Sequence, residues 1–174
     1  DSKVERCKEM KHGQLFAGIG GFGLAAQWAG INNVWANEID PFCCKVLKKN
    51  FPKIKVYEKD IREIGNHNLE PVDIISGGFP CQPFSQAGKR KGTDDNRYLW
   101  PEMLRIIREL QPTYVIGENV AGLLSMENGE TLKAILSDLE NEGYNNEVFL
   151  IPTCAVGGWH RRDRLWIICH AKHN

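Results

Sequence analysis

The feature that most constrains the fold of this chain is an alternation of short β-like runs with longer amphipathic segments. The expected strands are Gln14–Ala17, Val34–Asn37, Lys55–Tyr57, Val72–Ser76, Tyr114–Gly117, Glu147–Ile151 and Arg164–Cys169. The expected helices are Phe22–Ala29, Pro41–Asn50, Leu99–Leu110 and Gly129–Glu142. This alternation predicts an α/β fold with a mostly parallel sheet and helices on both faces. Because too few residues separate the last two strands for a crossover helix, we expect them to form an antiparallel pair.

The composition is that of one globular domain. The chain has 174 residues, of which 42% are hydrophobic and 25% are charged, and this excludes collagen-like, coiled-coil and disordered proteins. We expect residues 14–174 to form the domain and residues 1–13 to be an N-terminal extension. The apolar stretch 15–31 holds five glycines and is short for a membrane span, so no membrane association is expected.

The charge balance gives no sign of a generally basic nucleic-acid binder, and the cysteine spacing gives no sign of a zinc site. Lysine plus arginine and aspartate plus glutamate number 22 each, so a polyanion would have to meet a local basic patch. The six cysteines include no Cys-x-x-Cys pair, and we therefore expect reduced thiols and no metal site.

A glycine loop lies between the first expected strand and the first expected helix. The run Gly18–Gly23 satisfies the pattern G-x-G-x-x-G, in which a ligand can approach the backbone and the free N–H groups of a helix start. Glu38, at the end of the second strand, can accept both hydroxyls of a ribose. Asp60, after the third strand, can accept from an adenine amino group. These residues indicate an adenosine site, either for a dinucleotide, as in a nicotinamide-dependent oxidoreductase, or for S-adenosylmethionine.

A cysteine between two prolines follows the fourth expected strand. Pro80 and Pro83 stiffen the backbone around Cys81, at the carboxyl edge where α/β sheets place their sites. Most lone cysteines are buried and inert, but a glycine-rich loop is a poor position for a core residue. We therefore interpret Cys81 as a nucleophile.

Four motifs in order resemble those of the DNA (cytosine-5) methyltransferases. They are Leu15–Gly21, Phe79–Ser85, Glu118-Asn119-Val120 and Arg162-Asp163-Arg164. They are similar to the S-adenosylmethionine loop, the catalytic loop, the Glu-Asn-Val motif and the paired-arginine motif of that family. The resemblance implies a Rossmann-like S-adenosylmethionine-dependent methyltransferase fold. It also implies methyl transfer to C5 of cytosine in double-stranded DNA, in a bacterial or phage-like cytoplasm, or in the nucleus if the source is eukaryotic.

The resemblance implies roles for four catalytic residues. Cys81 would add to C6 of the cytosine and so make C5 nucleophilic. Glu118 would contact N3 and the amino group of the ring as Cys81 adds. Arg162 would contact cytosine O2, and Arg164 would help to order the catalytic loop.

The resemblance also implies which residues bind the cofactor and the nucleic acid. The cofactor-binding residues would be Phe16, Gly18, Gly20, Glu38, Ile39, Asp60, Ile61, Pro80 and Leu99. The nucleic-acid-binding residues would be Gln82, Ser85, Lys89, Arg90, Lys91 and Arg161. Because C6 cannot be attacked inside the base stack, the target base has to be flipped out of the duplex.

The family pattern continues beyond the paired arginines, where this sequence stops. A target-recognition domain and a last motif are expected there, so a second chain that carries the recognition domain is one expected partner. Two alternatives stay open. One is a non-catalytic or partner-dependent subunit of a split methyltransferase that binds S-adenosylmethionine or DNA, and the other is a cytosine-5 methyltransferase acting on transfer RNA.

Overall fold

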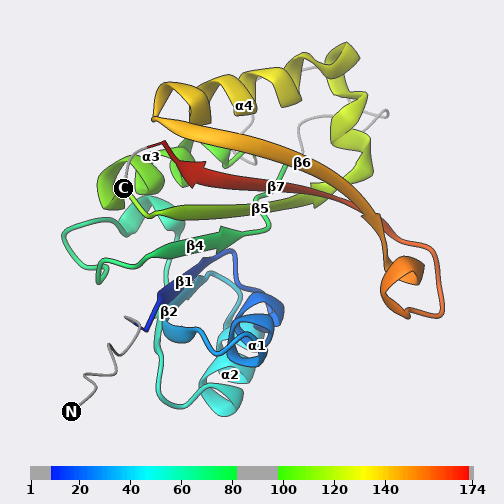
Figure 1. The fold of residues 1–174 in the computed structure, drawn as a ribbon. Coiled ribbons are helices and arrows are strands. Elements are labelled where there is room, and N and C mark those ends of the chain that lie inside the picture. Colours follow the sequence, from blue (N-terminus) through cyan, green and yellow to red (C-terminus); the bar gives the residue numbers. More distant parts are fainter. Residues whose placement is uncertain (1–8, 82–97, 173–174) are drawn as a thin grey trace, which may run out of the picture.

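The computed structural model describes residues 9–81 and 98–172, which form one seven-stranded sheet with helices on both faces (Figure 1). The strands are β1 (Lys11–Leu15), β2 (Asn32–Glu38), β3 (Lys55–Glu58), β4 (Ile74–Gly77), β5 (Tyr114–Val120), β6 (Tyr144–Pro152) and β7 (Asp163–Ala171). The α-helices are α1 (Gly21–Trp28), α2 (Pro41–Asn50), α3 (Trp100–Leu110) and α4 (Glu130–Asn141). Short 3-10 helices are η1 (Ile61–Glu63), η2 (Ala121–Leu124), η3 (Met126–Gly129) and η4 (Thr153–Val156).

The sheet has the order β3-β2-β1-β4-β5-β7-β6. Strands β1 to β5 pair in parallel, and β7 is antiparallel to both β5 and β6. The predicted α/β fold with an antiparallel final strand pair is therefore confirmed. The chain moves outward from β1 to β3 and then returns to β4 on the other side of β1. This reversal is a topological switch point, the place where open α/β sheets bind their ligands.

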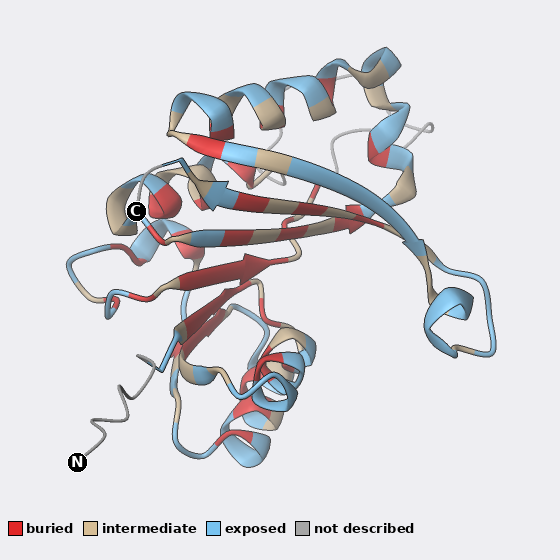
Figure 2. Ribbon diagram, viewed as in Figure 1, coloured by how far each residue is buried: buried red, intermediate tan, exposed pale blue. Residues whose placement is uncertain are grey.

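The central strands are covered on both faces. Helices α1 and α2 lie on one face of the sheet, and α3 and α4 lie on the other (Figure 1). All four residues of β4 are buried, and Figure 2 shows burial concentrated in the strands at the middle of the sheet. The main core lies under α3 and α4 and includes Ile75, Met103, Ile107, Ile135 and Leu165. Coverage on two faces explains the short, nearly continuous apolar runs of the central strands.

The first strand begins three residues earlier than predicted, at Lys11. Residues 11–13 therefore belong to the sheet and not to an N-terminal extension. The start of the strand was missed because His12 is polar although it is buried; Gln14, the other buried polar residue, lies inside the predicted strand. His12 Nε2 lies 2.7 Å from Ser76 Oγ, and Gln14 Oε1 accepts a hydrogen bond from the Gly23 N–H (2.9 Å). These hydrogen bonds offset part of the cost of burial, although Gln14 Nε2 has no partner among the described residues, and a hydrophobic pattern does not reveal them.

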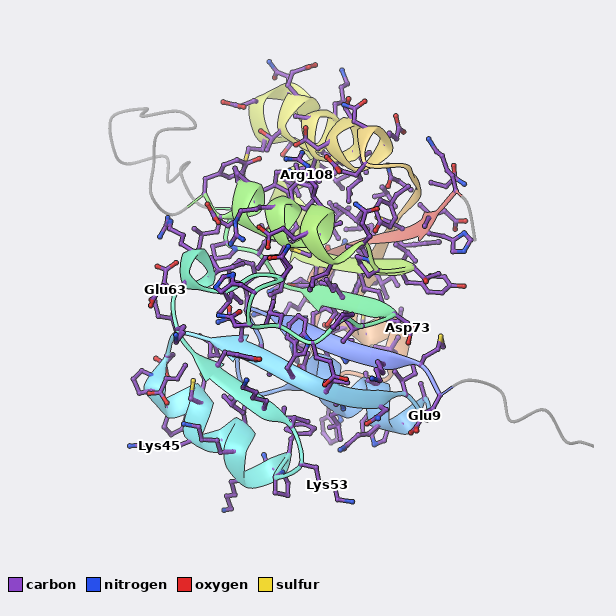
Figure 3. The ribbon with its side chains drawn as sticks, turned by 90° about the vertical axis from the view of Figure 1, so that its left-hand side faces the viewer. Glu9, Lys45, Lys53, Glu63, Asp73 and Arg108 are labelled. Atoms are coloured by element: carbon purple, nitrogen blue, oxygen red, sulfur yellow. The ribbon has the colours of Figure 1, made fainter. Side chains whose placement is uncertain are left out.

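The carboxyl ends of the parallel strands meet at one edge of the sheet. Figure 3 shows the two edges: Glu63 follows β3 at the carboxyl edge, and Asp73 precedes β4 at the opposite edge. The loops that carry the predicted site residues all leave from the carboxyl edge. No helix within residues 9–81 and 98–172 combines the length and apolar character needed to cross a membrane.

Candidate active site

A cavity of about 290 Å³ opens at the carboxyl edge, beside the switch point. Its lining residues are Phe16, Asn37, Glu38, Ile39, Lys59, Asp60, Ile61, Gly78, Pro80 and Leu99. Seven of the nine residues expected to bind the cofactor line it; the exceptions are Gly18 and Gly20. Carboxylates beside apolar side chains suit a ligand that has hydroxyl groups and a flat ring. A larger cavity, of about 430 Å³, lies beside the carboxyl ends of α1 and α2 and holds none of the expected site residues.

The carboxylate of Glu38 is held by backbone N–H groups. Its Oε2 accepts from Gly18 (2.7 Å), and its Oε1 accepts from Ile39 (2.8 Å) and Asp40 (3.0 Å). A carboxylate oxygen accepts about two hydrogen bonds, so Oε1 is saturated and Oε2 keeps one position for a ligand hydroxyl. Glu38 therefore fixes the glycine loop and at the same time faces the cavity.

The two glycines outside the cavity lining have different roles. Gly18 lies at the rim, through its hydrogen bond to Glu38. A Cβ on Gly20 would lie 2.5 Å from the ring of Phe51, so Gly20 permits close packing of the glycine loop on the end of α2 and does not face the ligand space. Phe16 has a φ of 52°, a conformation that is uncommon for a residue other than glycine and that typically accompanies functional sites.

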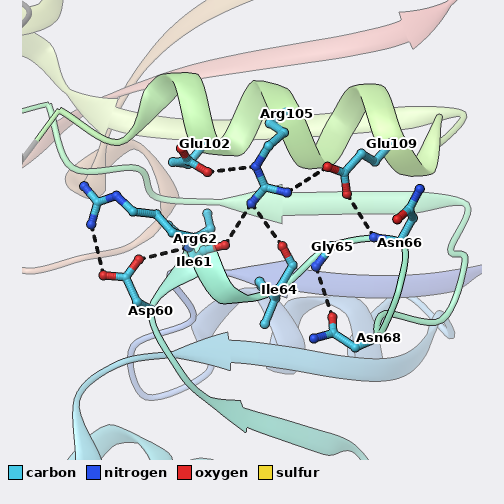
Figure 4. Close-up of polar contacts among 10 residues, drawn as sticks. All are labelled: Asp60, Ile61, Arg62, Ile64, Gly65, Asn66, Asn68, Glu102, Arg105 and Glu109. Carbon is cyan, nitrogen blue, oxygen red and sulfur yellow. Dashed lines mark hydrogen bonds and ion pairs between the residues drawn. The ribbon is translucent and has the colours of Figure 1, made fainter.

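Asp60 begins the short helix η1 at the cavity wall. Its carboxylate accepts from the backbone N–H of Arg62 (2.9 Å) and pairs with the guanidinium of the same residue (3.0 Å) (Figure 4). Glu63 Oε1 in turn accepts from the Asp60 N–H (3.3 Å), which completes a capping box. The aspartate expected to contact adenine therefore also orders its own loop.

Arg105 of α3 also contacts the loop that carries Asp60 (Figure 4). Its guanidinium donates to the carbonyls of Ile61 and Ile64 (3.0 Å each), and Glu102 and Glu109 accept from it (2.8 Å each). One side chain thus connects α3 to the loop that carries Asp60. Sequence reasoning did not identify this connection, because it joins segments 41 to 44 residues apart.

Three lining residues were missed by sequence reasoning: Asn37, Lys59 and Gly78. The buried Asn37 amide donates to the carbonyls of Tyr57 (3.2 Å) and Lys59 (2.9 Å), which joins the ends of β2 and β3. Asn37 and Lys59 directly precede expected site residues, and Gly78 lies two positions before one. Their position next to expected site residues in the chain was the only sequence signal that could have identified them.

The thiol of Cys81 is only 6% exposed. Its Sγ lies 3.8 Å from the Sδ of Met126 in η3, and the backbone of Cys81 forms a β-bridge with Tyr98. Burial raises the pKa of the Cys81 thiol to about 11. Burial therefore favours the protonated thiol of Cys81 at neutral pH.

Glu118 and Asn119 face the cysteine loop from the end of β5. A Cβ on Gly78 would lie 2.9 Å from Glu118 Oε2, so the carboxylate packs directly against the glycine that lies three residues before Cys81. The Asn119 amide donates to the carbonyl of Phe79 (3.0 Å). Glu118 thus places its carboxylate beside the loop of Cys81, and Asn119 holds the start of that loop through a hydrogen bond.

The paired arginines lie in different environments. Arg164 Nε is 2.7 Å from Glu118 Oε1, and both side chains are partly buried. Arg162 is exposed and precedes β7. The structure thus brings Arg164, and not Arg162, to Glu118.

Among the expected nucleic-acid-binding residues, only Arg161 is described. It is exposed and pairs with Asp163 (3.1 Å). The other five, Gln82, Ser85, Lys89, Arg90 and Lys91, lie outside the described residues.

Comparisons with known proteins agree with this geometry. The family model described as C-5 cytosine-specific DNA methylase matches residues 10–174. Type II methyltransferase M.PspPI of Psychrobacter sp. is 43% identical over 170 residues, which cover 95% of this chain and 40% of that protein. Type II methyltransferase M.HhaI of Haemophilus parahaemolyticus is 36% identical over 156 residues, covering 89% and 47%. The solved structure of a candidate DNA modification methyltransferase from an Escherichia coli prophage has a TM-score of 0.81 at 27% identity, covering 94% of this chain and 47% of that chain.

Proposed function

Because the chain belongs to the C-5 cytosine-specific DNA methylase family, we propose that it is the catalytic part of an enzyme that methylates C5 of cytosine in DNA. The observation that carries this proposal is the convergence of Cys81, Glu118 and Arg164 at the sheet edge that also holds the Glu38 cavity. The chain spans 40% to 47% of the length of the two relatives described above, so the activity of a whole enzyme is part of the proposal.

The cavity fits S-adenosylmethionine as the cofactor. Its volume of about 290 Å³ is close to the lower end of small-molecule sites, roughly 300–1,000 Å³. The free acceptor position of Glu38 would take a ribose hydroxyl, and Phe16 and Ile39 would cover an adenine ring. When bound, the cofactor supplies the methyl group. A nicotinamide-dependent oxidoreductase would leave Cys81 and Glu118 without a role.

Cytosine C5 is too weak a nucleophile to accept a methyl group unaided. The Cys81 thiolate would form a C–S bond at C6 and push the ring electrons toward C5 and N3. Glu118, in its acid form, would donate its proton to N3 as this bond forms and take the proton back when the thiolate leaves. After C5 has gained the methyl group, loss of its proton restores the double bond and expels the Cys81 thiolate. Because the thiol is buried and protonated in this structure, DNA binding has to change its surroundings before it can react.

We assign the contact with cytosine O2 to Arg164 and not to Arg162. The support is position: Arg164 already lies against Glu118, and a base that meets this carboxylate with N3 would bring O2 toward the guanidinium. Arg162 is exposed at the end of the turn that precedes β7, where it is available to the DNA backbone.

We also propose that the remainder of the enzyme, on the same polypeptide or on a partner chain, supplies DNA specificity and covers an apolar face. This face of β5, β7 and β6 includes the exposed residues Val120, Phe149 and Ile151. Its only described aromatic cover from α1 is Phe22, whose ring meets Trp166 edge-on. These apolar side chains border the Glu118–Arg164 pair on the same face, and exposed apolar side chains gathered in this way indicate an interaction site.

The test combines labelled S-adenosylmethionine with DNA that contains 5-fluorocytosine, which cannot lose a proton from C5. We expect a covalent adduct between Cys81 and the DNA, absent in Cys81→Ala, once the recognition part of a relative is supplied. Cofactor binding without an adduct under these conditions would refute catalysis and indicate a binding subunit. An adduct with transfer RNA but not with DNA would change the substrate class.

A further inference from the structure

The turn between β6 and β7 is closed by its own hydrogen bonds. The N–H and hydroxyl of Thr153 both donate to the carbonyl of Arg162 (3.1 and 3.0 Å), and the Gly158 N–H donates to the carbonyl of Thr153 (2.9 Å). Figure 1 shows this turn standing out beyond the end of the sheet. Its shape is therefore set locally, without support from a neighbouring element.

This ordered turn presents apolar side chains to solvent. Trp159 is fully exposed (102%), and Val156 is also largely exposed. A tryptophan can bury a large area, and leaving it in water on a well-ordered turn forgoes that stabilisation. The tip of the hairpin therefore has the composition of a contact surface.

Basic residues follow the exposed tryptophan in the chain. His160, Arg161 and Arg162 follow it directly, and all three are exposed. The only acidic residue between positions 152 and 164 is Asp163, which pairs with Arg161. In a chain of zero formal net charge, this is a local basic patch next to an aromatic ring.

The turn lies at the same edge as the catalytic residues. Arg164, the second residue of β7, pairs with Glu118, and Val120, the last residue of β5, is in register with Arg164. The hairpin tip thus projects from the border of the active site.

We propose that the hairpin tip, formed by Val156, Trp159, His160 and Arg161, is a nucleic-acid contact surface in which Trp159 stacks on a base. Arg161 contacts a phosphate in this arrangement. Charge complementarity selects the partner, because guanidinium groups beside an exposed aromatic ring are typical of nucleic-acid recognition. The inference rests on the proposed function, since it takes DNA as the substrate.

The test compares Trp159→Ala with Trp28→Ala in the full chain loaded with S-adenosylmethionine. Trp28 is a matched control, because it is also exposed (79%) but lies at the far end of α1 from the glycine loop. Affinity for a labelled DNA duplex is measured by fluorescence anisotropy at two salt concentrations. We expect Trp159→Ala to weaken binding about tenfold, Trp159→Phe to restore most of it, and Trp28→Ala to leave it unchanged. Arg161→Ala should weaken binding and also reduce its salt dependence.

Equal affinities of the Trp159→Ala and Trp28→Ala variants would overturn the inference, as would a wild-type chain that does not bind DNA. Loss of assembly with the recognition part of a relative, with DNA affinity intact, would show that the tip contacts protein instead. The adduct experiment separates these failures from failure of the proposed function. An adduct with no effect of Trp159→Ala refutes only the DNA-contact surface, whereas DNA binding that depends on Trp159 without an adduct refutes only catalysis.

Discussion

Arg164 and Glu118 form an ion pair across the antiparallel strands β7 and β5, with Nε 2.7 Å from Oε1. Glu118 also lies against Gly78, which connects the pair to the loop of Cys81. We expect Arg164→Ala to slow adduct formation with 5-fluorocytosine DNA about a hundredfold, since it removes a group aimed at the reacting base. Arg162→Ala should have a much smaller effect. Equal losses in the two variants would contradict the assignment of Arg164 to the base.

The reactivity of Cys81 should depend on pH in a predictable direction. Burial raises its pKa from 9.0 to about 11, so the thiolate is scarce at neutral pH and increases as the pH rises toward 11. Iodoacetamide should therefore label Cys81 much more slowly than the exposed Cys154 at pH 7, as measured by peptide mass spectrometry. Because the folded state favours the protonated thiol, the raised pKa of Cys81 adds to the free energy of unfolding. This contribution is fully present below pH 9 and is lost as the pH rises from 9 to about 11. Equal labelling of the two cysteines at pH 7 would contradict the buried state.

Glu38→Gln should weaken S-adenosylmethionine binding at least tenfold. The carboxylate accepts three backbone hydrogen bonds, whereas an amide has one acceptor oxygen and would place an NH₂ group against an N–H donor. Isothermal titration calorimetry measures the affinity. Glu58→Gln is the matched control, because Glu58 ends β3 and pairs with Lys48 at the surface. Unchanged affinity in Glu38→Gln would refute the ribose assignment.

Arg105→Ala should destabilise the fold and weaken cofactor binding together. It leaves the carbonyls of Ile61 and Ile64 without their donor, at a cost of about 1–3 kcal/mol, and releases the loop of Asp60. Arg108→Ala, on the same helix, removes an exposed pair with Glu142 and should cost less than about 1 kcal/mol. Urea unfolding gives the stabilities and calorimetry the affinities. A loss of stability with normal cofactor affinity would show that Arg105 does not position the site.

Gly13→Ala should be strongly destabilising, by about 3 kcal/mol. A Cβ at this position would lie 2.2 Å from the ring of Trp35, which is buried and held by a hydrogen bond to the carbonyl of Glu70 (2.8 Å). Gly21→Ala provides the contrast, because nothing lies within 4 Å of a Cβ there. Thermal unfolding of both variants measures this difference in stability. A stable Gly13→Ala variant would mean that β1 does not pack as described.

The regular elements could be predicted because their signals are local. Apolar periodicity located all seven strands and four helices, and Pro41 marked the start of α2 correctly. The start of β1 was missed because the signal lies in hydrogen-bond partners from distant segments: Ser76 is 64 residues from His12. The sequence alone does not show whether the fold will provide a hydrogen-bond partner for a polar side chain.

The sequence by itself determined the alternating α/β architecture, the glycine loop and the position of Cys81 between two prolines after a central strand, because each depends on residues that are neighbours in the chain. Only the tertiary structure decided which arginine meets Glu118, that Arg105 supports the Asp60 loop, and that Trp159 stands free beside the active site. These relationships depend on distance and burial across strands that are far apart in sequence. The physical reason is that the strand order brings separate carboxyl ends to one edge, and the spacing of residues along the chain does not encode that proximity.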